Sequence, residues 1–368
     1  MLRTLSRMVL LGTLLAIPAA TARAQAAPPG LIRTQLADGI YLLRAPSDLD
    51  LWTATNVVVI VNDRDVTVFD SFTRAGTARM AIAEIRKITD KPVRTLINSH
   101  WHQDHWSGNE EFQKAWPGVQ IIATTQTRDF MKRMGAAHFA ASIEPSVVAS
   151  RAALDTAVKT GRQADGTALT PEARKKLEQD LAQVEAFKKE VSSLRRVLPT
   201  VAYRDTLILW SGSREFRLIS VTGDATATTV LYLPAERILV TGDALVAQED
   251  GKGGPPWTTT NYFITPWLAS LRGLESLDVA TIVPGQGLPF HDKRYLQLTI
   301  RIYQALIDQV HAALERGVVG QAEVVATLNA DSLAAQYNID GRVPPDFRSW
   351  VGRLGAKIYQ ESLDGQTK

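Results

Sequence analysis

The sequence of 368 residues contains no cysteine. This absence excludes disulfide bonds, thiolate metal ligands and a cysteine nucleophile, although it does not by itself identify a cellular compartment. Histidine is also scarce, with six residues in the whole chain. A metal site in this protein must therefore be built from histidine and oxygen ligands, which zinc and similar ions accept when thiols are missing.

The N-terminal region lacks an apolar run that is long enough to span a bilayer. Residues 8–17 are apolar, follow Arg3 and Arg7, and precede two small-x-small motifs at 22–24 and 24–26. This is the pattern of a cleaved secretory signal peptide, which we expect over residues 1–26. We therefore expect a periplasmic or secreted protein with no stable membrane insertion of the mature chain; an uncleaved membrane anchor is the alternative.

The chain also lacks an excess of charge of one sign. The net charge of +3 comes from Arg3, Arg7 and Arg23 in the expected leader, and the remainder of the chain is neutral overall. A nucleic-acid-binding protein would carry a basic stripe in its folded part. We therefore expect a small-molecule substrate and no nucleic-acid partner, whereas the sequence makes no prediction of the oligomeric state.

Three of the six histidines lie together at positions 100, 102 and 105, with an aspartate at 104. Four ligating side chains on one short turn can face a single cavity only if something offsets their repulsion and desolvation, and a divalent cation does so. The turn follows a predicted strand at 93–98, and ligand sites in open α/β sheets lie at such strand ends. We therefore predict a metal site, with a solvated polar turn as the alternative.

Strand and helix patterns alternate along most of the chain. Apolar residues at helical spacing predict a helix over 74–87 and another after Ser107, which we expect to be an N-cap. Between 125 and 198 the β signals vanish, and Thr170 followed by Pro171 is typical of a helix start, so we predict an all-helical insertion. Short β-branched segments predict strands at 39–44, 56–62, 65–70, 93–98, 119–123, 206–209, 215–221, 228–233, 237–241 and 281–284.

These motifs resemble those of the metallo-β-lactamase superfamily. Residues 100–105 match its HxHxDH signature residue by residue, and Gly242-Asp243 matches its Gly-Asp segment. Asp70 resembles the aspartate of its first motif. The resemblance covers about residues 32–290 and implies an α/β fold, an αββα sandwich over 30–300, with a helical insertion at about 125–198 and a C-terminal helical extension over 301–368.

Carried over from that superfamily, the resemblance implies a pair of neighbouring metal sites. Asp224 and Gln286 stand where the family has ligand histidines. Asp224 keeps the ability to bind a metal, whereas the neutral Gln286 is a weak ligand for zinc. We therefore expect one or two divalent ions, zinc first and manganese or iron as alternatives, with the second site incompletely held. The implied ligands are His100, His102 and Asp224 for the first ion, Asp104, His105 and Gln286 for the second, and Asp243 as the bridge.

The resemblance implies a secreted metal-dependent hydrolase that uses metal-bound hydroxide to cleave an ester, thioester, lactone or β-lactam bond, with phosphodiesters as a further option. Asp104 is the expected catalytic residue, acting as a proton shuttle. Asp243 resembles the thioesterase and lactonase branches, whereas secretion favours a β-lactamase. Two alternatives stay open: a family member that has lost its chemistry and acts as a binding protein, and a mononuclear iron dioxygenase. His291, five residues after Gln286, is a candidate substitute ligand.

Overall fold

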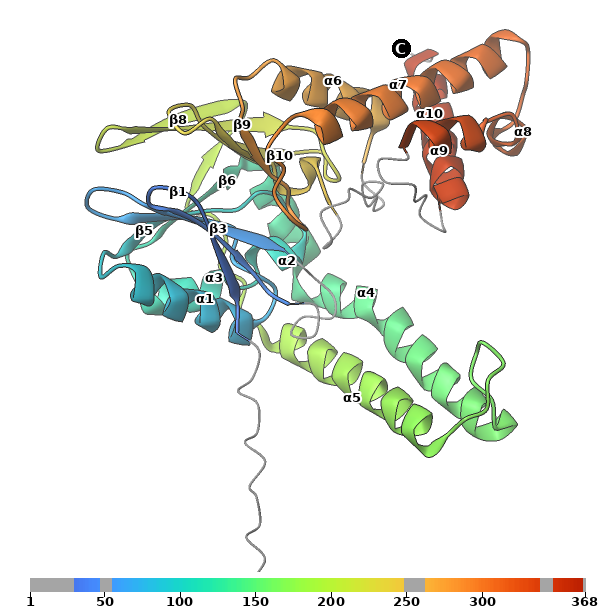
Figure 1. The fold of residues 1–368 in the computed structure, drawn as a ribbon, viewed down its shortest axis with the longest axis horizontal. Helices are drawn as coiled ribbons and strands as arrows, with labels where there is room; N and C mark the ends of the chain where they lie inside the picture. The colour runs from blue at the N-terminus through green and yellow to red at the C-terminus, as the bar shows by residue number, and fades with distance from the viewer. Residues whose placement is uncertain (1–29, 47–54, 248–261, 338–346, 367–368) are drawn as a thin grey trace, which may run out of the picture.

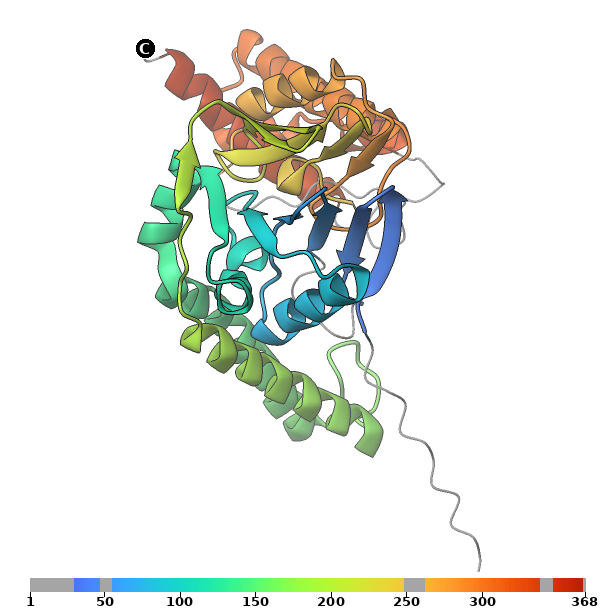
Figure 2. The same cartoon turned by 90° about the vertical axis from the view of Figure 1, so that its left-hand side faces the viewer.

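Two β-sheets pack face to face, and helices cover the outer face of each (Figures 1 and 2). The structure is a computed structural model that describes residues 30–46, 55–247, 262–337 and 347–366. The expected signal peptide at 1–26 lies outside these residues. The two sheets and their outer helices confirm the α/β sandwich predicted from the sequence.

The first sheet has seven strands in chain order, antiparallel from β1 to β4 and parallel from β4 to β7. Strand β3 lies inside this sheet and is apolar at every position after Asn56, because both of its faces are covered. The parallel strands all end at one edge, which is where the sequence places the histidine motif. The strands are β1 (Ile32–Ala37), β2 (Ile40–Arg44), β3 (Asn56–Val61), β4 (Val66–Phe69), β5 (Val93–Ile97), β6 (Gln120–Thr124) and β7 (Val201–Tyr203).

The second sheet has five strands in the order β12-β11-β10-β9-β8. Only β11 and β12 run parallel to each other, and the other neighbours are antiparallel. The apolar layer between the sheets includes Phe69, Ile97, Leu218 and Leu231. The strands are β8 (Thr206–Ser211), β9 (Arg214–Val221), β10 (Thr228–Leu233), β11 (Ile238–Val240) and β12 (Thr281–Val283).

Each sheet has its own set of covering helices. α1 (Ala75–Ile88) and α3 (Asn109–Ala115) cover the first sheet, and α1 packs through residues at helical spacing such as Ala78, Ile82 and Ile85. α6 (Ile264–Glu275), α7 (Arg294–Glu315), α8 (Gln321–Ala326), α9 (Ala330–Tyr337) and α10 (Phe347–Gln366) form one apolar cluster with the second sheet. The domain boundary expected at residue 300 falls inside α7, so this helix belongs both to the sandwich and to the C-terminal helices.

The predicted helical insertion consists of α4 (Thr125–Thr160) and α5 (Pro171–Ser193), which form a hairpin that projects from the body (Figure 1). Thr170 caps α5 by accepting a hydrogen bond from Ala173 N at 3.1 Å, and Pro171 occupies the first turn, as the sequence predicted. The two helices pack through a small apolar cluster that includes Val147 and Phe187.

A helix follows Ser107 as predicted, but its N-cap is Gly108 and not Ser107. A four-residue helix, α2 (Gln103–Trp106), already begins inside the histidine motif, and Ser107 ends it by donating its N–H to Gln103 O at 3.0 Å. The next helix, α3, starts after Gly108, whose absent Cβ would lie 1.9 Å from Ser71 O. No helix within the described residues has the length and apolar character needed to cross a membrane.

Candidate metal centre

Strand ends from both sheets meet at one edge of the sandwich. From the first sheet, β4 leads to Asp70 and β5 leads to the histidine motif, and both strands run parallel. From the second sheet, β9 leads to Asp224, β11 to Asp243 in the short 3-10 helix η1 (Gly242–Ala244), and β12 to Gln286. Residues that are separated by up to 216 positions in sequence therefore face a common centre.

His105 is completely buried and is surrounded by carboxylates. Its Nδ1 lies 2.7 Å from Asp70 Oδ2. Its Nε2 lies 3.0 Å from Asp104 Oδ2 and 3.4 Å from Asp243 Oδ2. Since the hydrogen bond on Nδ1 fixes the ring, Nε2 is held toward the other two carboxylates, which is how an outer carboxylate orients a histidine that binds a metal.

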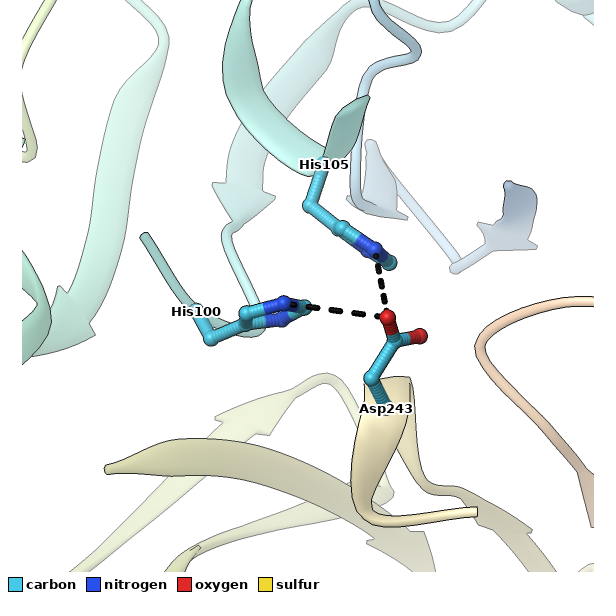
Figure 3. A group of neighbouring side chains, drawn as sticks. All are labelled: His100, His105 and Asp243. Carbon is cyan, nitrogen blue, oxygen red and sulfur yellow. Dashed lines mark ion pairs between the residues drawn. The ribbon is translucent and has the colours of Figure 1, made fainter. Parts of the chain in front are cut away.

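Asp70 is held in turn by Ser99, which donates its backbone N–H at 2.7 Å and its hydroxyl at 2.8 Å. The same hydroxyl lies 3.0 Å from His100 Nδ1, so that His100 Nε2 is directed at Asp243 Oδ2 at a distance of 3.8 Å. Figure 3 shows the rings of His100 and His105 approaching the carboxylate of Asp243 from two sides. Asp70 adopts a left-handed backbone with φ of 63°, a conformation that aspartate tolerates better than most residues.

A second group of donors shares Asp243 with the first. His102 Nδ1 lies 3.5 Å from Asp224 Oδ2, and His102, Asp224 and Asp243 each offer a ligand atom within 4.8 Å of the others. His100, His105 and Asp243 satisfy the same limit. Asp243 is thus common to both groups, which is the position expected of a bridging carboxylate.

These donors fit a divalent cation. Two atoms that are each about 2.1 Å from one ion lie at most about 4.2 Å apart, and the three nitrogen–oxygen distances of 3.8, 3.4 and 3.5 Å meet this limit. Asp243 Oδ1 is buried without a hydrogen-bond partner among the described residues. Buried polar atoms are rarely left unsatisfied, so this oxygen fits the role of a cation ligand.

The protonation of the three histidines differs within this small volume. Burial lowers the pKa of His100 well below its usual value, and the facing His105 and His102 lower it further. Burial also lowers the pKa of His102. Burial acts in the same direction on His105, but Asp104, Asp243 and Asp70 together raise its pKa well above the usual value. In the metal-free protein a proton on His105 therefore supplies part of the positive charge that the carboxylates need.

Two glycines allow Asp243 to reach the centre. A Cβ on Gly285 would lie 1.9 Å from Asp243 Oδ1, and a Cβ on Gly223 would lie 2.9 Å from Ala244 Cα. Any side chain at either position would displace η1 and the carboxylate that it carries. Gly223 and Gly285, which precede Asp224 and Gln286, therefore leave the space that η1 and the Asp243 carboxylate occupy.

All seven ligands expected from the sequence lie at this edge. His100 lies in one group with His105 and Asp243, and its Nε2 also lies 2.8 Å from His102 Nδ1, the histidine with which the resemblance paired it, so the division of the ligands between two ions stays a prediction. Gln286 approaches Asp104 through its amide nitrogen, which lies 3.4 Å from Oδ2. His291 does not join the cluster, because it is exposed and lies 3.5 Å from Thr281 Oγ1.

Sequence reasoning missed the residues that support the ligands. Ser99 precedes the motif, Thr55 precedes β3, and Asn56 is the first residue of β3; of the three, only Asn56 had been placed in a predicted strand. Thr55 donates its hydroxyl to Asp104 Oδ2 at 2.8 Å, although 49 positions separate the two residues. A polar pair at the start of an apolar strand was the available signal. Trp101 and Trp106, which flank ligands of the motif, are buried in a small apolar cluster with Met131 and Ala225.

The fold and the donor cluster define an α/β sandwich protein with a candidate metal site, and comparison with known proteins gives its family. The sequence profile of the Metallo-beta-lactamase superfamily matches residues 50–286, which is more than half of the chain. The chain belongs to this superfamily, whose members bind divalent metal.

Individual relatives are hydrolases by name. The chain is 24% identical over 250 residues to a linear primary-alkylsulfatase of Pseudomonas sp. (strain ATCC 19151), an alignment that covers 66% of this chain and 43% of the relative. The chain therefore spans less than half the length of that curated relative.

Solved structures show the same fold. The stereoselective inverting sec-alkylsulfatase Pisa1 from Pseudomonas sp. aligns with a TM-score of 0.58 and 17% identity, over 91% of this chain and 50% of its own. A metallo-beta-lactamase from Pontibacter korlensis aligns with a TM-score of 0.50 and 14% identity, over 74% of this chain and 99% of its own.

Proposed function

We propose that this protein is a metal-dependent hydrolase of small-molecule esters, and that alkyl sulfate esters are the first substrates to test. The observation that carries the proposal is the buried cluster in which Asp243 is shared by two groups of ligand atoms. When bound there, a divalent cation supplies Lewis-acid chemistry, because it acidifies water and polarises the bond to be cleaved.

The choice of bond is supported by the comparisons. An alkylsulfatase is related in sequence, and the alkylsulfatase structure aligns with 91% of this chain, against 74% for a metallo-beta-lactamase. Carboxylic esters, thioesters, lactones and β-lactams, which the sequence also suggested, are the competing substrates. In each case water adds its oxygen to the electrophilic centre and the leaving group departs with a proton.

The chain's own residues have distinct tasks in this scheme. His100, His105 and Asp243 would hold one cation, and His102, Asp224 and Asp243 would hold a second. Burial opposes ionisation of Asp104, but His105 and His102 and the hydroxyl of Thr55 lower its pKa to about 2. An acid of this strength stays ionised at neutral pH. Asp104 therefore suits the task of accepting a hydrogen bond from the attacking water better than that of storing a proton.

The test is hydrolysis by protein purified without added metal, with elemental analysis of the same sample. The panel contains a linear alkyl sulfate, an aryl carboxylic ester, a thioester, a lactone and a β-lactam. We expect release of sulfate that stops on chelation and returns with zinc or manganese. His105→Gln should abolish it, whereas His311→Gln, at an exposed position on α7, should not.

Other results would decide between the alternatives. A stable fold that binds no metal and hydrolyses nothing would indicate a binding protein. Iron near one equivalent with oxygen uptake would indicate a dioxygenase, and hydrolysis of the β-lactam alone would move the proposal to that bond.

We also propose that the protein is exported, which the pattern in residues 1–26 supports. Expression of the full chain in a Gram-negative host, followed by N-terminal sequencing of protein from the periplasmic fraction, tests this. We expect a new N-terminus after residue 24 or 26. An intact Met1 in the cytoplasmic fraction would contradict export.

A further inference from the structure

The turn that carries Gln286 is fixed from two directions. On one side, the side-chain amide of Asn56 donates to Pro284 O at 2.8 Å and to Gly287 O at 2.9 Å, and Asn56 N–H donates to Gly285 O at 2.8 Å. These contacts join residues that are more than 220 positions apart. They attach the turn to Asn56, the first residue of β3, in the opposite sheet.

On the other side, the same turn is bonded to the segment that follows Asp243. Gly285 N–H donates to Leu245 O at 2.9 Å, and Ala247 N–H donates to Gln286 O at 3.0 Å. Because the backbone of Gln286 is bonded on both flanks, its side chain starts from a fixed point between Asp104 and Asp243. A residue that is anchored so firmly is suited to setting the position of a neighbour.

Two donors from this anchored pair of segments converge on one oxygen atom. Thr55 Oγ1 donates to Asp104 Oδ2 at 2.8 Å, and Gln286 Nε2 approaches the same atom at 3.4 Å. His105 Nε2 lies 3.0 Å from it as well. Within the described part of the chain, these three contacts of Asp104 all fall on Oδ2. Oδ1 is therefore the oxygen that we assign to the reacting molecule.

The direction of the Gln286 amide follows from its contact. Its Nε2 donates toward Asp104 Oδ2 at 3.4 Å, and of the two ends of an amide only the nitrogen donates. The end of Gln286 that faces Asp104 is therefore the NH2 group, which has no lone pair to offer a cation. This geometry conflicts with the ligand role that its place in the sequence implied.

We infer that Gln286 is a positioning residue and not a metal ligand, and that with Thr55 it holds Asp104 Oδ2 so that Oδ1 acts on the reacting molecule. The effect on turnover rests on the proposed hydrolase function, whereas the effect on metal binding does not. Gln286 thus stands as a hydrogen-bond donor at the place where the resemblance implied a ligand. The ligand atoms of the site are those gathered around Asp243.

The experiment compares Gln286→Met and Thr55→Val with wild type, after removal of metal. Both substitutions keep the approximate size of the side chain and remove its donor. Cobalt(II) is titrated into each apoprotein, its visible spectrum is recorded to report coordination, and kcat and KM are then measured on the best substrate of the panel. Thr55→Ser should restore the hydroxyl. Thr299→Val, which removes a buried hydroxyl from α7 that bonds Tyr295 O at 3.0 Å, is the matched control.

A positioning role predicts unchanged cobalt stoichiometry, affinity within about twofold and an unaltered spectrum for Gln286→Met. It predicts a fall in kcat of about tenfold to a hundredfold for both donor variants with little change in KM, which is the usual range for residues that orient a metal site. Thr55→Ser should recover most of that loss, and Thr299→Val should retain wild-type turnover.

Loss of a cobalt equivalent, or weakening of its affinity by more than tenfold in Gln286→Met, would overturn the inference. So would wild-type kcat in both donor variants. The metal titration needs no substrate, so it decides the assignment of Gln286 even if the wild-type protein hydrolyses nothing. Such inactivity would count against the proposed function alone.

Discussion

The two groups of ligands that share Asp243 are built differently. His105 is fully buried, and its ring is fixed by Asp70, which Ser99 fixes in turn. The side chain of His102 is 13% exposed and carries a pKa lowered by burial. The His105 group is therefore preorganised around a histidine whose pKa is raised, whereas the His102 group lies nearer to solvent and contains a histidine whose pKa is lowered.

This contrast suggests an order of metal binding. A fixed ring loses little freedom when it binds an ion, so the His105 group should hold metal more tightly once its proton is displaced. The His102 group should exchange metal more readily and face the incoming substrate. Asp243 belongs to both groups. Its loss should therefore weaken metal binding at both and abolish the difference in affinity between them.

The largest effect is expected from Asp243→Asn, which keeps the size of the side chain and removes its charge. Both groups should lose metal, and kcat/KM should fall by roughly a thousandfold, equivalent to about 4 kcal/mol. Metal analysis and steady-state kinetics measure the two effects. Asp278→Asn, at an exposed ion pair with Arg237, is the control and should behave as wild type. Retention of full metal content by Asp243→Asn would show that neither group depends on it.

An intermediate effect is expected from Asp70→Asn. The change removes the carboxylate that orients His105, so metal affinity at the His105 group should fall by about tenfold to a hundredfold, while the His102 group keeps its affinity. Calorimetric titration that resolves two binding events measures this difference. Asp65→Asn, at the opposite end of β4 where Asp65 accepts from Asn62, is the matched control. An equal loss at both groups would mean that they are not organised separately.

The smallest effect is expected in the pH dependence of the metal-free protein. The pKa of His105 is raised on folding, so its stabilising contribution is complete below its unfolded value of about 6.5 and is lost as the pH rises through the folded value. The pKa of His102 is lowered, so stability is instead lost as the pH falls below about 6.5.

Melting temperatures in chelator from pH 5 to 9 separate the two histidines. Wild type should lose a few degrees toward each extreme. His105→Gln should lack the alkaline loss, whereas His102→Gln should reduce the acid loss, to which the lowered pKa of His100 also contributes. If His105→Gln changed the melting temperature only at acid pH, the assignment of the alkaline loss to His105 would be wrong.

Much of the fold could be predicted because local patterns determine it. The apolar run of β3 and the apolar residues at helical spacing in α1 predict a strand and a helix by themselves, because these side chains must be buried in any fold of the chain. Thr170 and Pro171 start α5 for reasons that lie within a few residues. The error at Ser107 has the opposite origin, since α3 begins where Gly108 passes the backbone of Ser71, a contact between distant segments.

The sequence alone determined that histidine and aspartate side chains would gather at a strand end, since six consecutive residues carry four of them. It also determined the superfamily, because the order of the motifs is a property of the chain. Which nitrogen faces which carboxylate was decided only when two sheets closed on each other. Thr55, Asn56 and Gln286 acquire their contacts with one another and with Asp104 from that closure, because hydrogen bonds depend on distances of a few ångströms that no sequence interval specifies.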